Sequence, residues 1–419
     1  MSLARQYEMK DSGVEWIGEI PCGWTISNIG SLYTQRNEKV SDKDFAPLSV
    51  TKQGVLPQLE TVAKTDNGDN RKLVRAGDFA INSRSDRRGS CGIAQQDGSV
   101  SLINTVLKPR DEMHPVYYNW LFHTEQFADE FYKWGYGIVD DLWSTHWSEM
   151  KKIMVIYPPL STQAAIAAYL DVKCATIDGV IAEAKASIEE YKAWKASVIF
   201  EAVTKGLNPD VKMVDSGMEW IGQIPQEWEI IPFGKIATIK ACLVNPEMYP
   251  SLPQISPENI EKGSARLMDT FKSVKDAGVI SWNHLFHKGQ IIYSKVRPTL
   301  NKLFLAQFDG LCSADMYPIE TTQNTNFIVY AMLSESFVQQ VAAITTNRVK
   351  MPKINKQEIS KIVILLPPHN EQASIADYLD EKCASIDAVI AEKEALIAEL
   401  ETYKKSLIFE TVTGKRRVC

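Results

Sequence analysis

Two short stretches of this chain carry cations among small polar residues, and these side chains could bind a polyanion. The first stretch spans residues 82–90 and the second spans residues 294–302. A guanidinium fork can bond two acceptors on a guanine edge, while lysine commonly contacts phosphate. A third stretch, residues 345–353, has the same character. The candidate nucleic-acid contacts are Arg84, Arg87, Arg88, Lys295, Arg297, Lys302, Arg348 and Lys350.

Taken singly, each of these stretches is explained more simply as an ordinary solvated basic turn. The first two, however, occupy the same place in two otherwise unlike regions. Each follows a glycine and a strand-like run, at residues 77–81 and 289–293, and each precedes a helix-like run, at residues 116–134 and 326–343. This shared position favours the binding interpretation for both stretches.

Motifs for catalysis or metal binding are missing from the sequence. It has no Gly-x-x-x-x-Gly-Lys-Ser/Thr phosphate loop, no Gly-x-Gly-x-x-Gly and no His-Glu-x-x-His. The two Pro-Pro pairs follow Tyr157 and Leu366, so they form no Asn- or Asp-Pro-Pro-aromatic element of the amino-methyltransferase type. His284 and His287 lack a nearby cysteine or carboxylate, and the seven cysteines form no Cys-x-x-Cys pair. The sequence therefore predicts a non-catalytic chain without a metal site.

The elements that position the basic stretches are duplicated. Asp-Ser-Gly-Val-Glu-Trp-Ile-Gly at residues 11–18 returns as Asp-Ser-Gly-Met-Glu-Trp-Ile-Gly at residues 215–222. The block Pro-Pro-Leu-Ser-Thr-Gln-Ala-Ala-Ile-Ala-Ala-Tyr-Leu-Asp at residues 158–171 returns at residues 367–380 as Pro-Pro-His-Asn-Glu-Gln-Ala-Ser-Ile-Ala-Asp-Tyr-Leu-Asp. Between these blocks the two halves share little identity. The pattern indicates a repeated frame with different contents.

A long helix is expected after each Pro-Pro pair. Ser161 and Asn370 are suitable N-cap residues, and the stretches that follow contain no proline for over 40 residues. Such a helix rises roughly 60 Å. Gly206 and Gly414 supply plausible stops. Apolar residues at heptad spacing form a helix–helix seam, interrupted at Lys393. The seam residues are Leu170, Cys174, Ile177, Ile181, Ile188, Leu379, Cys383, Ile386, Ile390 and Ile397.

The two helices are expected to pair as an antiparallel intramolecular coiled coil with approximate two-fold symmetry. The alternative is that each helix packs only on its own globular domain. If the halves are equivalent, the N-terminal segment should pack beside the C-terminal end of the second helix, near residues 409–415. Trp16 and Trp220 are then expected to be packing anchors.

The predicted fold class is α+β, with two mixed α/β domains joined by the two long helices. The expected segments are a short repeat (1–23), a first mixed domain (24–157), the central helix (158–214), a second short repeat (215–227), a second mixed domain (228–366) and the C-terminal helix (367–419). The net charge of −6 says little about partners, because residues 223–366 sum to about +3 and residues 24–157 to about −1 by direct counting. No signal peptide or membrane-spanning run is evident, so a cytoplasmic location is expected.

With both motifs duplicated at half-chain spacing, the chain resembles the specificity subunits of Type I restriction–modification systems. The resemblance implies a DNA-binding subunit whose two domains each read one half of a split double-stranded target, with helices that set the spacer. It further implies two methyltransferase subunits that use S-adenosylmethionine for DNA methylation, and restriction subunits that use ATP and magnesium, with no cofactor on this chain. The alternative is a coiled-coil adaptor whose two domains bind proteins or other ligands.

Overall fold

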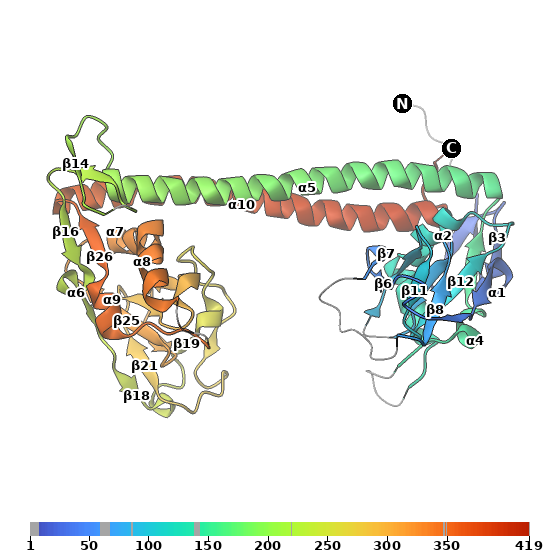
Figure 1. The fold of residues 1–419 in the computed structure, drawn as a ribbon, viewed down its shortest axis with the longest axis horizontal. Helices are drawn as coiled ribbons and strands as arrows, with labels where there is room; N and C mark the ends of the chain where they lie inside the picture. The colour runs from blue at the N-terminus through green and yellow to red at the C-terminus, as the bar shows by residue number, and fades with distance from the viewer. Residues whose placement is uncertain are drawn as a thin grey trace. The chain divides into compact units, whose positions relative to one another are not determined.

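The computed structural model describes residues 8–58, 68–84, 87–137, 143–218, 220–346, 348 and 350–418. It divides into two compact units, one of Met1–Ala184 with Glu394–Cys419 and one of Lys185–Lys393. Two long helices run through both units, α5 (Leu160–Lys205, 46 residues) and α10 (His369–Val412, 44 residues). Each unit therefore contains one mixed domain and part of each long helix (Figure 1).

The repeated short motif forms the same hairpin in both units. In unit 1 it joins β1 (Met9–Asp11) to β2 (Glu19–Pro21), and in unit 2 it joins β14 (Met213–Asp215) to β15 (Gln223–Pro225). The aspartate at the start of each turn accepts from the amide of the glycine two residues on, at 2.9 Å in unit 1 and 3.0 Å in unit 2. That glycine has a positive φ in both copies, which favours glycine over other residues. The Asp-Ser-Gly repeat is thus a turn motif.

The first hairpin packs beside the end of α10, which confirms the expectation drawn from the repeat. The backbone of Gly414 lies so close to Pro21 and Trp24 that an added Cβ would stand 2.6 Å from the proline ring and 2.8 Å from the indole. The Lys415 ammonium donates to the Ile17 carbonyl at 3.1 Å. Gly414 also has a φ of 74°, so glycine here both ends the helix and admits the hairpin.

The expectation for the two motif tryptophans holds for only one of them. Trp16 packs edge-on against Phe127, with ring centroids 6.0 Å apart. Trp220 is 46% exposed and lies outside the core, so its prediction as a packing anchor is wrong. The next residue does the packing instead, since Ile17 and Ile221 are both buried. The hairpin turns the isoleucine inward and leaves the indole on the rim.

The mixed domain of unit 1 is built from small antiparallel sheets with short helices around them. Its strands are β3 (Thr25–Asn28), β4 (Tyr33–Arg36), β5 (Lys39–Val40), β6 (Leu48–Thr51), β7 (Gly54–Pro57), β8 (Arg71–Val74), β9 (Phe79–Asn82), β10 (Cys91–Ile93), β11 (Gly98–Val100), β12 (Asn104–Pro109) and β13 (Met154–Tyr157). Its helices are α1 (Ile29–Leu32), α2 (Pro115–Phe122), α3 (Glu125–Lys133) and α4 (Trp147–Met150). The sheets have the orders β10-β9-β12-β4, β11-β8-β5, β6-β7 and β13-β3.

The mixed domain of unit 2 follows the same plan. Its strands are β16 (Glu229–Pro232), β17 (Ala237–Ile239), β18 (Leu243–Val244), β19 (Pro253–Ile255), β20 (Lys272–Ser273), β21 (Asn283–Phe286), β22 (Ile291–Ser294), β23 (Leu303–Leu305), β24 (Gly310–Cys312), β25 (Met316–Thr321) and β26 (Val363–Leu366). Its helices are α6 (Phe233–Ile236), α7 (Thr325–Leu333), α8 (Glu335–Thr345) and α9 (Lys356–Lys361), with short 3-10 turns η3 (Pro246–Met248), η4 (Pro257–Asn259) and η5 (Pro298–Leu300). The sheets have the orders β17-β25-β22-β23, β18-β21-β24-β19-β20 and β16-β26.

The two mixed domains correspond residue for residue over their central strands. The pair Asn104↔Asn82 in unit 1 is matched by Met316↔Ser294 in unit 2, and both members are shifted by 212 positions. Between β8 and β9, and between β21 and β22, stands a glycine whose amide bonds an alanine carbonyl, at 2.9 Å and 2.8 Å respectively. The frame is therefore duplicated in backbone geometry although the side chains differ.

Each helix-like run is in fact two helices. α2 and α3 break at Thr124, and α7 and α8 break at Ser334. The Thr124 hydroxyl accepts from the Phe127 amide at 3.2 Å, so it caps a new helix where the sequence pattern indicated a continuous one. No single helix in the described ranges is long and apolar enough to cross a membrane. The bent pair of α7 and α8 passes that test together, by length and composition only.

The glutamine of the Pro-Pro-x-x-x-Gln motif ties the start of each long helix to its own mixed domain. Gln163 is fully buried; its Oε1 accepts from the His114 amide at 2.9 Å and its Nε2 donates to the Pro158 carbonyl at 2.8 Å. Gln372 repeats both bonds, at 3.0 Å, with the Asn324 amide and the Pro367 carbonyl. These bonds give the repeated glutamine its physical role.

The expected N-caps are wrong by one or two positions. α5 begins at Leu160 and α10 at His369, so Ser161 and Asn370 lie inside the first turn. The carbonyl of Pro159 accepts from the amide of Gln163 at 3.0 Å, which places the start of the helix directly after the prolines. The ends match expectation, since α5 stops one residue before Gly206.

The long helices lie side by side in each unit (Figure 1). Ion pairs join them. In unit 2 Lys195 binds Asp387, and in unit 1 Lys404 binds Asp178, with N–O distances of 2.7 Å and 2.6 Å. The first half of α5 meets the second half of α10, and the reverse, so the helices are antiparallel. The interrupting Lys393 places its ammonium 5.8 Å from the Tyr191 ring centre. The α+β prediction with two paired long helices is confirmed.

Most of the predicted seam residues are buried in their units. Leu170, Cys174, Ile177, Ile181, Ile188, Leu379, Cys383 and Ile386 are each at most 9% exposed. Ile390 and Ile397 are half-buried. The seam assignment and the segment boundaries stay predictions, but this burial is what a packed apolar seam requires.

Candidate nucleic-acid interface

The basic stretch of unit 1 follows β9 and is held by backbone bonds to a distant segment. Arg84 bridges to Ser144, and the Thr145 amide donates to the Ser83 carbonyl at 2.9 Å. The guanidinium of Arg88 forms an ion pair with Asp129 and lies 4.8 Å from the Tyr132 ring centre. The Arg87 and Arg88 side chains are exposed. Residues 85 and 86 of this stretch lie outside the described residues.

The basic stretch of unit 2 follows β22 in the equivalent place. Lys295 and Lys302 each donate to a backbone carbonyl, of Ala314 and Pro257, at 2.7 Å. The exposed Arg297 has a φ of 45° and its amide donates to Pro352 at 2.8 Å. In the described part of the chain no hydrogen bond or ion pair engages its guanidinium. Arg297 is thus the cation of this stretch best placed to meet a ligand.

The third stretch is largely committed to its own domain. Arg348 binds both carboxylate oxygens of Glu358, and hydrogen bonding to that carboxylate raises the pKa of the guanidinium above its ordinary value. The same contact, with a bond from the Asn355 amide, lowers the pKa of Glu358. Lys350 is exposed. Residues 347 and 349 lie outside the described residues. This ion pair gives Arg348 a structural role that competes with ligand binding.

A groove of about 570 Å³ in unit 1 brings polar residues together that the sequence did not connect. It adjoins the basic stretch, since Ser83 is part of its wall. Lys72, His146 and Lys151 line it, and no aspartate or glutamate is among its lining residues. Its members are Gln35, Lys72, Ser83, Leu102, Ile103, Thr105, Ser144, His146, Trp147, Ser148 and Lys151.

Sequence reasoning missed this groove because its residues come from separate elements. Gln35 lies on β4, Lys72 on β8, Thr105 on β12, and Trp147 opens α4. These positions are spread over more than 100 residues without a shared motif. Only the pairing of β12 with β4 and β9, and the return of residue 144 to the basic stretch, bring them together.

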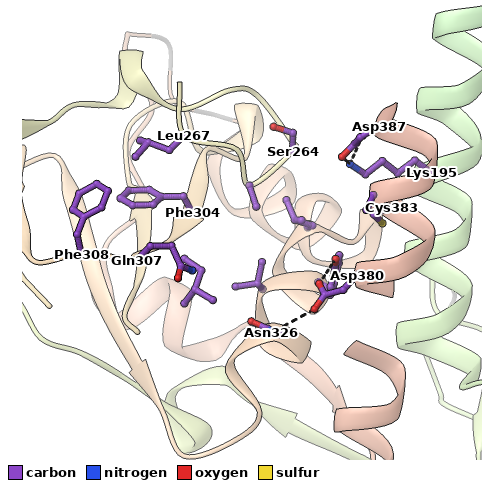
Figure 2. A pocket seen from close by; sticks show the side chains of 16 residues that line it. Lys195, Ser264, Leu267, Phe304, Gln307, Phe308, Asn326, Asp380, Cys383 and Asp387 are labelled. Atoms are coloured by element: carbon purple, nitrogen blue, oxygen red, sulfur yellow. Dashed lines mark hydrogen bonds and ion pairs between the residues drawn. The ribbon is translucent and has the colours of Figure 1, made fainter. Parts of the chain in front are cut away.

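A second cavity, of about 550 Å³, lies in unit 2 between the mixed domain and the long helices (Figure 2). Asp380 faces it while accepting from the Tyr330 hydroxyl at 2.7 Å and the Asn326 amide group at 3.3 Å. Asp387, bound to Lys195, is also in its wall. Two carboxylates on the wall would repel phosphate, so this cavity does not suit DNA. Among the described residues, no group of three or more His, Cys, Asp or Glu is placed to hold a metal ion.

Comparison with known proteins shows what this chain is similar to. A profile of the Type I restriction modification DNA specificity domain matches residues 225–402. The Type I restriction enzyme EcoDI specificity subunit of Escherichia coli is 28% identical over 282 residues. That match covers 64% of this chain and 63% of the relative, so the chain spans less than two thirds of the relative's length.

Solved structures share the fold across nearly the whole chain. A chain from a structural study of complex assembly and conformational transition in the type I R-M system has a TM-score of 0.70 at 12% identity, covering 94% of this chain and 98% of its own length. The HsdS subunit from Thermoanaerobacter tengcongensis has a TM-score of 0.51 at 14% identity and covers 95% of this chain and 98% of its own. Together with the duplicated hairpins and helices, these matches show that the chain shares the fold of these structures, and that its residues 225–402 are similar to the Type I restriction modification DNA specificity domain.

Proposed function

We propose that this chain is the DNA sequence-specificity subunit of a Type I restriction–modification complex. Each mixed domain, predicted at residues 24–157 and 228–366, reads one half of a bipartite double-stranded target. The paired helices α5 and α10 set the number of base pairs between the halves. Arg84, Arg87 and Arg297 are the cations that we expect closest to the DNA.

The observation that carries this proposal is that the two mixed domains share one backbone arrangement but present different side chains on it. At the bridge where the basic stretch meets its returning segment, unit 1 pairs Arg84 with Ser144, while unit 2 pairs Val296 with Lys353. Base readout requires different side chains for different sequences on a frame that holds them in the same way. A duplicated frame with unlike readout positions meets that requirement.

We also propose that the long helices dock two methyltransferase subunits, and that restriction subunits join the complex. Exposed apolar side chains on the helices support docking, because large apolar groups left in water commonly mark contact surfaces. They include Val172 (66% exposed), Trp194 (53%) and Tyr403 (47%). S-adenosylmethionine, ATP and magnesium are expected on those partner subunits. This chain supplies recognition and no catalytic group.

Replacing residues 24–157 with the equivalent domain of a relative tests the proposal. Sequencing of methylated bases in cells carrying the complex should show one half-site changed and the other retained. The unmodified chain with the same partners is the control. A change in both half-sites would contradict separate reading.

The adaptor alternative makes a different prediction. A complex that recognises DNA should bind duplex with an affinity that falls steeply as salt rises, because phosphate contacts release counter-ions. Absence of duplex binding by the complex of this chain with its methyltransferase subunits would favour the adaptor.

A further inference from the structure

The groove of unit 1 has two lysines and no carboxylate among its described lining residues. Lys72 reaches it from β8, and Lys151 follows α4. The Lys72 ammonium donates to the Asn104 carbonyl at 2.7 Å. In the ranges that the structure describes, no ion pair engages either lysine. Within the described residues, no carboxylate of the groove lining offsets the charge of these two lysines.

Burial makes this charge costly without a counter-ion. Lys72 is half-buried, and removal from water lowers the pKa of its ammonium below the ordinary value. A charged group taken out of water without an opposite charge destabilises the fold. An anion in the groove would offset that cost. Lys151 is exposed and adds a second cation at the same place.

Unit 2 shows that the fold does not require lysines without a carboxylate beside them at this place. By the 212-residue correspondence of the strands, Ile103 of unit 1 matches Asp315 of unit 2. The Asp315 carboxylate lies 2.8 Å from the Lys353 ammonium and 3.6 Å from that of Lys295. Lys295 and Lys353 of unit 2 are therefore paired with an internal carboxylate. In unit 1 the matching Ile103 is 39% exposed and leaves the groove cationic.

We propose that the groove of unit 1 seats a phosphate of the DNA backbone, held by Lys72 and Lys151. The inference rests on the proposed function and adds a contact that positions the duplex without reading a base. Lysine is a compact point charge suited to phosphate, and the hydroxyls of Thr105 and Ser144 are donors in the same lining. The basic stretch next to the groove then remains available to contact base edges.

The test measures duplex affinity of the complex with its methyltransferase subunits at 50 to 200 mM salt. Loss of one phosphate contact lowers the slope of log affinity against log salt concentration by about 1. The fold-loss of affinity between 50 and 200 mM salt should therefore be about four times smaller for Lys72→Gln than for wild type. Ile103→Asp, which copies the carboxylate of unit 2, should have the same effect without altering the lysine. Ile103→Asn and Lys43→Gln are the matched controls and should keep the wild-type slope; the Lys43 side chain is 80% exposed and outside the groove.

The outcomes separate the two proposals. Unchanged slopes for both Lys72→Gln and Ile103→Asp, with wild-type thermal unfolding, would overturn the phosphate site alone. An altered methylation motif in Lys72→Gln would show that Lys72 reads a base, and would also overturn it. Failure of the wild-type complex to bind any duplex would end the proposed function as well.

Chemical labelling gives a direct second measurement. Because its pKa is lowered, Lys72 has a larger neutral fraction than an ordinary lysine at the same pH, and amine-reactive reagents attack the neutral form. Mass spectrometry should show Lys72 labelling suppressed when DNA is bound, while Lys43 labelling is unchanged. Equal labelling of Lys72 with and without DNA would argue against the site.

Discussion

Gln163 offers the sharpest test of how each long helix is held to its domain. Its side-chain amide is fully buried and satisfies one backbone donor, on His114, and one backbone acceptor, on Pro158. In Gln163→Ala the part-buried His114 amide and the buried Pro158 carbonyl both lose their partner. Each orphaned group costs about 1–3 kcal/mol, so the variant should lose about 2–6 kcal/mol of unfolding free energy.

Gln163→Glu separates the hydrogen bonds from packing. A carboxylate still accepts from the His114 amide, but it cannot donate to the Pro158 carbonyl, and burial raises its pKa. The variant should therefore be less stable than wild type at neutral pH. The deficit should shrink as pH falls through the carboxyl pKa, because the protonated acid regains a donor.

Calorimetry of the full chain gives the change in stability, and hydrogen exchange locates it. Faster exchange is expected at α2 in the Gln163 variants, and at α7 in the matched Gln372→Ala. Gln126→Ala, on the exposed side of α3, is the control and should stay within about 0.5 kcal/mol of wild type. A Gln163→Ala effect no larger than that of the control would refute the reasoning.

Three further outcomes follow from the helices and from the third basic stretch. Inserting one heptad after both Ala184 and Lys393 lengthens the helix pair by about 10 Å. The spacer in the methylation motif should then lengthen by up to about three base pairs, with both half-sites kept. An unchanged spacer would contradict the proposal that the helices set the spacer. Leu379→Ala should lower the unfolding free energy by about 2–5 kcal/mol in a denaturant titration, and a loss below 1 kcal/mol would contradict a packed seam. Arg348 lowers the pKa of Glu358 in the folded protein, so the ion pair stabilises the fold above the unfolded-state pKa and this stabilisation is lost as pH falls. Glu358→Gln should therefore make the free energy of unfolding fall less steeply with decreasing pH in acid.

The repeated motifs allowed the frame to be predicted in some detail. Heptad spacing and the absence of proline gave both long helices, and the glycines gave their ends at residues 205 and 412. Equivalence of the two halves placed the first hairpin beside Gly414. These features are local or periodic, so they can be recognised from the sequence alone.

The same reasoning misplaced features that depend on tertiary contacts. Trp220 looked like an anchor because tryptophan usually packs, yet the turn of the hairpin leaves it on the rim. Ser161 looked like a cap, but the buried Gln163 holds the start of the helix instead. Each error arose where a second segment, distant in sequence, decided which side chain was buried.

By itself, then, the sequence determined that the same structural frame occurs twice, that two long helices pair with each other and that two unlike domains are attached to them. Only the tertiary structure decided which cations are already bound to carboxylates, as Arg88 and Arg348 are, and which face a groove whose described lining holds no carboxylate, as Lys72 does. The physical reason is that charge balance is set by distances between strands and loops far apart in the chain. Periodicity fixes which face of a helix is apolar, but it carries no information about those distances.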